Sequence, residues 1–97
     1  MACGVLSPEA QLLTDFFEAS RLYDTAVMAR LSARPMNPRT EGIVDAFDIQ
    51  RVDKDDDGSS RVTVNARVRR FDGEVGSRQL VFSLVRQDGR WFIAGWK

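Results

Sequence analysis

Hydrophobic and polar residues alternate along the second half of the chain, and this pattern predicts antiparallel β-strands. The clearest stretch runs from Arg61 to Phe71, where apolar side chains occupy every second position. Side chains of a strand alternate between its two faces, so one face of this strand is apolar. Its members are Val62, Val64, Ala66 and Val68.

A hairpin is predicted at the C-terminal end. Two strand-like segments, Gln79–Arg86 and Arg90–Trp96, flank the pair Asp88-Gly89. Asp-Gly is favoured in two-residue type I′ turns, in which both central residues need a positive φ. The turn fixes the register of the hairpin, and it predicts that Val81 pairs with Trp96.

This register gives the predicted sheet two different faces. The core face holds Leu80, Phe82, Leu84, Trp91 and Ile93, beside the valines, because a one-residue slip would bury arginines instead. The opposite face holds Val81, Val85, Phe92, Ala94 and Trp96, together with Arg61, Arg67 and Arg69. A solvated sheet face is mostly polar. We therefore expect a partner, a second subunit or a ligand on this opposite face.

The first half of the chain has helical spacing. Ser7-Pro8-Glu9 is typical of a helix start, with Ser as N-cap and Pro at the first helical position. An apolar stripe follows and predicts a helix that ends near Arg21. The stripe consists of Leu12, Leu13, Phe16, Phe17 and Ala19. Asp24 is the expected N-cap of a second helix, residues 25–32, and Tyr23 is expected to pack back on it as a hydrophobic staple.

A connecting loop from Arg34 to Gly42 leads to the first predicted strand, Ile43–Val52. Ile43, Phe47 and Ile49 share the expected core face, and Asp45 shares it too. The order of two helices followed by four antiparallel strands predicts an α+β domain with the helices on one face of a meander sheet.

Length and composition bound the possible functions. The 97 residues suffice for one domain, which we place at residues 8–97 behind a tail of residues 1–7. Fourteen basic residues balance fourteen acidic ones, so there is no electrostatic basis for binding nucleic acid or acidic membranes. The chain lacks histidine, the commonest general base and metal ligand. We expect no cofactor and no metal.

The N-terminal Ala2-Cys3-Gly4 resembles the end of a bacterial lipoprotein signal, in which the cysteine is lipidated. The resemblance implies a protein of the bacterial cell envelope that is lipid-anchored through Cys3, with Met1 as an added start residue. The basic residues are 12 Arg and 2 Lys, which is typical of a GC-rich bacterial coding bias. A cytoplasmic protein is the alternative.

Several segments together resemble the cystatin-like/NTF2-like group of α+β folds. They are Phe16-Phe17-Glu18-Ala19, Tyr23-Asp24 and Trp91-Phe92-Ile93-Ala94-Gly95-Trp96, and the resemblance spans Pro8 to Trp96. The chain is shorter than a full NTF2-like cone, because it is expected to lack a third helix and at least one strand of that fold. The resemblance implies a pocket between the helices and the concave sheet. Its expected lining is Tyr23, Met28, Asp45, Phe47 and Trp91.

Enzymes of this group use a carboxylate base with a tyrosine as hydrogen-bond donor, which points to Asp45 and Tyr23. Burial of Asp45 would raise its pKa. The alternative is that Asp45 reaches solvent or pairs with an arginine.

Asp53-x-Asp55-x-Asp57-Gly58 matches the opening of a calcium loop. The twelfth position of such a loop carries a bidentate Glu, whereas here it is Val64, a predicted core residue. The alternative, which we prefer, is a solvated turn rich in Asp and Gly.

We expect a non-catalytic envelope protein that binds a partner protein or a small apolar ligand through its curved sheet, as a homodimer. The expected interface is Arg67, Val81, Val85, Phe92 and Trp96. The alternative is a small NTF2-like enzyme or ligand carrier with a pocket between helices and sheet.

Overall fold

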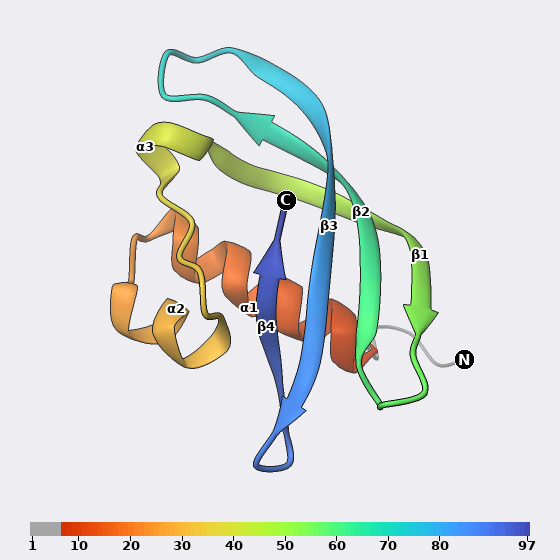
Figure 1. Ribbon diagram of the computed structural model, residues 1–97. Helices are drawn as coiled ribbons and strands as arrows, with labels where there is room; N and C mark the ends of the chain where they lie inside the picture. The colour runs from red at the N-terminus through yellow and green to blue at the C-terminus, as the bar shows by residue number, and fades with distance from the viewer. Residues whose placement is uncertain (1–6) are drawn as a thin grey trace, which may run out of the picture.

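The computed structural model describes residues 7–97 and has the predicted α+β architecture. The helices are α1 (Pro8–Arg21), α2 (Thr25–Leu31) and α3 (Pro38–Glu41). The strands are β1 (Ile43–Lys54), β2 (Ser60–Arg69), β3 (Val75–Gln87) and β4 (Arg90–Trp96). The strands form one antiparallel sheet in the order β1-β2-β3-β4, and α1 crosses behind it in Figure 1.

The predicted start of α1 is confirmed. The Ser7 Oγ accepts a hydrogen bond from the Ala10 N–H at 3.2 Å, and Pro8 occupies the first turn. The apolar stripe of α1 is buried. The one-turn helix α3 was not predicted. Asn37 caps it by accepting the Arg39 N–H, and Pro38 begins it.

The register of β2 and β3 confirms the predicted core face. Val62 pairs with Phe82 and Val64 pairs with Leu80. All four of these side chains have an exposed fraction of 1% or less. The arginines of β2 consequently lie on the face opposite the helices, which we call the outer face.

The β3–β4 hairpin follows the prediction only over its first half. Asp88 and Gly89 have φ values of 53° and 79°, as a type I′ turn requires. The predicted pairing then continues as far as Leu84 with Ile93. Beyond this pair a β-bulge adds one residue to β4, and Phe82, rather than Val81, pairs with Trp96.

The bulge moves Trp96 to the other side of the sheet, because an extra residue reverses the alternation of the side chains that follow it. Trp96 is 5% exposed and packs against Phe82, with ring centroids 6.1 Å apart. The prediction that Trp96 belongs to the outer face and to an interface there was wrong. Trp91, predicted to lie in the core, is only half-buried.

The first strand differs from the prediction in which residues face the core. Its pairing with β2 has two irregularities, one between Val44 and Ala46 and one after Ile49. Val44 is buried, whereas Ile43 is half-buried. Asp45 falls within the first irregularity and is exposed, so its predicted place in the core was wrong. Its carboxylate instead forms an ion pair with Arg69 at 3.5 Å.

Candidate functional site

The five residues predicted to line one pocket lie in four different places. Met28 is fully buried in the core. Asp45 and Phe47 line a shallow depression of about 160 Å³ beside α1. Trp91 lines a second depression, between α2 and the β3–β4 hairpin. Tyr23 lines a third, which shares only Arg21 with the depression beside α1 and shares no residue with the one at Trp91.

Aromatic side chains fill the space between α1 and the sheet. The Phe17 ring contacts both Phe47 and Phe82 edge-on, with centroids 5.1 and 5.6 Å apart. Phe16 packs on Phe82 at 6.3 Å. The interior at this position is therefore a packed core.

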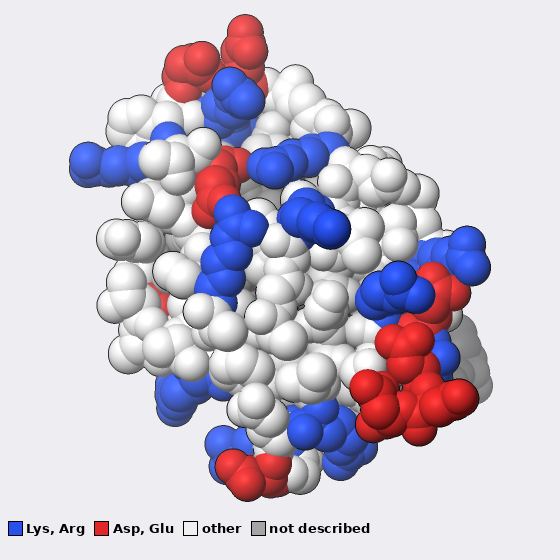
Figure 2. Space-filling view, in the orientation of Figure 1, with Lys and Arg blue, Asp and Glu red and all other residues white. Residues whose placement is uncertain are grey.

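The outer face has an uncharged centre with charged side chains around it (Figure 2). Of the predicted interface, Val81, Val85 and Phe92 are half-buried and Arg67 is exposed. The cross-strand neighbours of Val81 and Arg67 are the polar residues Thr63 and Ser77. This face is thus more polar than predicted, since Trp96 does not contribute to it.

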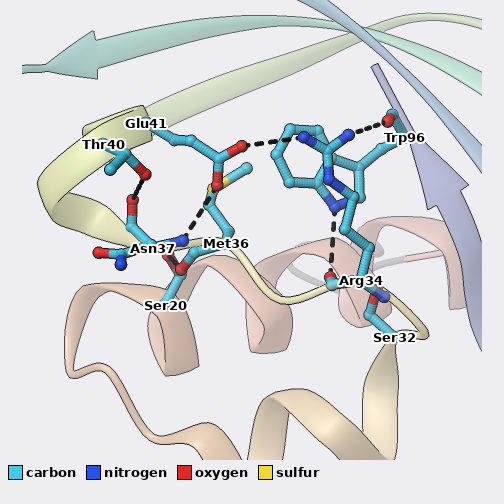
Figure 3. Close-up of polar contacts among 8 residues, drawn as sticks. All are labelled: Ser20, Ser32, Arg34, Met36, Asn37, Thr40, Glu41 and Trp96. Atoms are coloured by element: carbon cyan, nitrogen blue, oxygen red, sulfur yellow. Dashed lines mark hydrogen bonds and ion pairs between the residues drawn. The ribbon is translucent and has the colours of Figure 1, made fainter.

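Trp96 is covered by the segment that joins α2 to β1, residues 32–42, which we call the connector. The Arg34 guanidinium lies over the Trp96 ring at 3.9 Å and donates to the Trp96 carbonyl at 2.7 Å (Figure 3). Arg34 also forms an ion pair with Glu41 at 3.2 Å, and Glu41 accepts the Asn37 N–H at 3.0 Å. In return, the Trp96 indole N–H donates to the Arg34 carbonyl at 3.4 Å.

The connector also covers the free edge of β4. The Ala33 N–H donates to the Ile93 carbonyl at 2.9 Å, and Ser32 forms a parallel bridge with Ile93. The Ser20 hydroxyl of α1 holds the connector from the other side, by donating to the Met36 carbonyl at 2.9 Å. The sequence identified this segment only as a loop, because contacts between residues so distant in sequence leave no local pattern.

A groove opens on the other side of the connector, and two exposed aromatic side chains in its lining make it the candidate site. Its volume is about 490 Å³, within the range of ligand-binding sites. We call it the Tyr23–Phe71 groove after its two aromatic residues. Its lining consists of Arg21, Tyr23, Asn37, Pro38, Arg39, Ile43 and Phe71.

Tyr23 is held in the groove by the way α1 ends. The Asp24 N–H donates to the Ala19 carbonyl at 2.8 Å and the Tyr23 N–H to the Ser20 carbonyl at 3.0 Å, the two bonds of a Schellman motif. This motif places Tyr23 at a φ of 51°, a position that usually carries glycine. The Tyr23 side chain is half exposed, so its predicted role as a packed staple was wrong.

Phe71 lies at the tip of the β2–β3 turn. The Arg70 carbonyl accepts the Gly73 N–H at 2.9 Å, and Asp72 caps the turn by accepting the Glu74 N–H at 3.0 Å. Asp72 and Gly73 supply the chemistry that the turn needs. The Phe71 ring is 79% exposed, so it stabilises the turn little. Sequence reasoning missed Phe71, although an aromatic residue inside an otherwise polar turn is a usable signal.

Arginines supply the charge of the groove. The Arg39 guanidinium lies 5.8 Å from the Phe71 ring centroid and has no ion pair among the described residues. Arg21 is paired with Glu18 of α1, which raises the pKa of Arg21. An adjoining depression of about 260 Å³ shares Arg39 and Phe71 with the groove and adds Arg70 and Asp72.

The acidic β1–β2 turn is organised by Ser59. Its hydroxyl and its backbone N–H donate to one carboxylate oxygen of Asp57, at 2.6 and 2.9 Å, and these bonds lower the pKa of Asp57. An oxygen of the Asp55 carboxylate lies 3.2 Å from the same hydroxyl. Within residues 7–97 there is no cluster of three or more side chains that could hold a metal ion.

Searches against protein-family models, curated proteins and solved structures found no match to this chain. The α+β architecture is therefore established by the structure itself, and the resemblance to a particular family remains a prediction. Cys3, the predicted lipidation site, lies outside the described residues. Over residues 7–97, the helices are too short or too polar to cross a membrane.

Proposed function

We propose that the protein is a non-catalytic binding module whose site is the Tyr23–Phe71 groove. One observation carries this proposal: two exposed aromatic side chains line one groove, and one of them, Tyr23, occupies a backbone position that favours glycine. Exposed aromatic residues on a firmly held backbone are typical of binding surfaces. The Schellman motif and the β2–β3 turn provide that backbone.

Chemical-shift mapping tests the site. Benzyl alcohol, titrated into isotope-labelled protein, should shift the amide signals around Tyr23, Ile43 and Phe71, and Phe71→Ser should abolish these shifts. Leu22→Ser is the matched control, because Leu22 is 64% exposed but does not line the groove. Shifts spread evenly over the surface, or confined to the outer face, would contradict the proposal.

Self-association through the outer face is a second candidate, favoured by the uncharged centre of that face (Figure 2). Val81, Val85 and Phe92 are its apolar members. If the outer face forms a homodimer, Phe92→Asp should give a monomer in analytical ultracentrifugation. Val52→Asp is the control, since Val52 is an exposed apolar residue on an edge strand. A monomeric wild-type protein would reject this candidate.

The envelope compartment is a separate proposal that rests on Ala2-Cys3-Gly4 alone. A diacylglyceryl adduct on Cys3, found by intact-mass analysis of protein from the membrane fraction, would support a lipid-anchored binding module with envelope partners. An unmodified chain that retains Ala2 would favour the cytoplasm.

A further inference from the structure

We infer that the Tyr23–Phe71 groove binds an acidic segment of a partner protein, in which a carboxylate flanks an aromatic or branched apolar side chain. This inference rests on the proposed function and adds to it the chemical class of the partner. Charge, shape and local backbone conformation each support it.

The charge of the groove is of one sign. Its only charged lining residues are Arg21 and Arg39, and the adjoining depression adds Arg70 against Asp72. Arg39 and Arg70 have no ion pair among residues 7–97, whereas Arg21 is paired with Glu18. Guanidinium groups bind carboxylates through paired N–H donors. A carboxylate in the adjoining depression would therefore have two unpaired arginines, Arg39 and Arg70, in its lining.

The shape of the groove favours a chain segment over a small molecule. Protein pockets bury most of the surface of a small ligand, but here the Phe71 ring is 79% exposed and stands between two open depressions. An extended segment can lie along such a ridge, with an apolar side chain in the larger depression and a carboxylate in the smaller one. Successive side chains of an extended segment point to opposite sides, which suits the two depressions.

The backbone conformation of Tyr23 is the independent observation. A tyrosine at a φ of 51° is strained by its Cβ, and glycine at the same position would relieve the strain. About half of the side chain stays exposed, so its packing is less extensive than that of a core residue. Strain retained without a stabilising contact is typical of residues that serve binding.

Three capped tripeptides separate the terms of this inference: N-acetyl amides of Glu-Phe-Glu, Gln-Phe-Gln and Glu-Gly-Glu, titrated by chemical-shift mapping. Glu-Phe-Glu should bind about three- to tenfold more tightly than Gln-Phe-Gln, because exposed ion pairs are individually weak. Arg39→Gln should remove this preference, and Arg61→Gln, which changes an exposed arginine of β2 outside the groove, should leave it unchanged. Glu-Gly-Glu should not saturate.

Each other outcome has a definite meaning. If Gln-Phe-Gln binds as tightly as Glu-Phe-Glu, the inference about charge is overturned while the proposed function stands. If no peptide shifts the groove amides, the proposed function fails as well. Phenylacetate that binds as tightly as Glu-Phe-Glu would identify a small carboxylate as the occupant, and loss of wild-type self-association in Asp55→Asn/Asp57→Asn would identify the acidic turn of a second copy. Either result would overturn the inference that the occupant is a segment of a partner protein.

A stability measurement distinguishes recognition from structure. Tyr23→Gly should weaken Glu-Phe-Glu binding severalfold while the midpoint of thermal unfolding stays the same or rises. A fall in that midpoint together with weaker binding would mean that Tyr23 is a structural residue, and the argument from strain would be lost.

Discussion

Arg34 and Arg39 belong to the same connector, and each lies over an aromatic ring, yet their surroundings differ. Arg34 lies 3.9 Å from the Trp96 ring, which is 5% exposed, and it is bonded to the Trp96 carbonyl and to Glu41. Arg39 lies 5.8 Å from the Phe71 ring, which is 79% exposed, and it has no ion pair among the described residues. The first arrangement is closed and the second is open.

The difference separates stability from recognition. A cation–π contact contributes more when water is excluded from it, and hydrogen bonds to a charged group add to this. At Trp96 these contributions fasten the connector to the sheet. At Phe71 the donors of Arg39 remain available to another molecule. The same pair of residue types therefore serves two purposes, according to how much of the aromatic ring is buried.

Replacing the two aromatic rings should give the largest contrast. Trp96→Ala should lower the free energy of unfolding by about 3–5 kcal/mol, because it leaves a cavity beside Phe82 and removes the ring under Arg34. Phe71→Ala should change it by less than about 0.5 kcal/mol, as for other surface substitutions. Urea denaturation measures both values. Similar losses in the two variants would show that the open arrangement is structural after all.

Replacing the two arginines should show the same contrast at smaller scale. Arg34→Ala should cost about 1–2 kcal/mol, because it removes a charge-assisted hydrogen bond and a partly exposed ion pair. Arg39→Ala should cost less than about 0.5 kcal/mol. Hydrogen exchange of the Ala33 amide, which is bonded to Ile93, reports whether the connector has loosened. Faster exchange is expected in Arg34→Ala alone.

A gain in stability is expected at the open side. Tyr23→Gly should raise the free energy of unfolding by up to about 1 kcal/mol, because glycine adopts a φ of 51° without strain. Leu22→Gly tests the specificity of this gain, since Leu22 has a helical φ of −88°. A gain in both variants would trace the effect to the helix end in general.

The smallest effect is expected at the acidic turn, away from both arginines. Ser59→Ala should raise the pKa of Asp57 toward its ordinary value, because both the hydroxyl and the order it gives the turn are lost. The pKa of Asp57 is lowered in the folded protein, so its contribution to stability is present above the ordinary carboxylate pKa and is lost as pH falls through the lowered value. Carbon-detected NMR titration of the Asp57 carboxyl measures the change. An unaltered titration would mean that Ser59 does not order this carboxylate.

The sequence predicted those parts of the molecule that local chemistry decides. The start of α1, the type I′ turn at Asp88-Gly89 and the core face shared by β2 and β3 all follow from short-range patterns. Trp96 was assigned to the wrong face because the alternation of apolar and polar residues along a strand does not reveal a β-bulge. Asp45 was misplaced for the same reason, since an irregularity beside Val44 moves it out of the core.

The sequence identified only part of the groove. Tyr23 was named as a pocket residue, but its partners Arg39 and Phe71 were not, because they come from the connector and from a turn that meet it only in the folded chain. Long-range proximity of this kind is determined by how α3 and the β2–β3 turn approach each other. A single sequence contains no periodic signal for it.

The positions of the acidic turn and of the groove have a consequence for how the molecule meets others. The turn at residues 55–59 and the turn that carries Phe71 lie at opposite ends of β2 (Figure 1). The acidic turn places Asp55, Asp56 and Asp57 at one end of β2, whereas Arg21 and Arg39 of the groove lie toward the other end. A charged partner would be rotated into the productive orientation before contact, and only within the screening distance of about 8–10 Å that cellular salt allows. Recognition would then depend on ionic strength mainly through the rate of encounter.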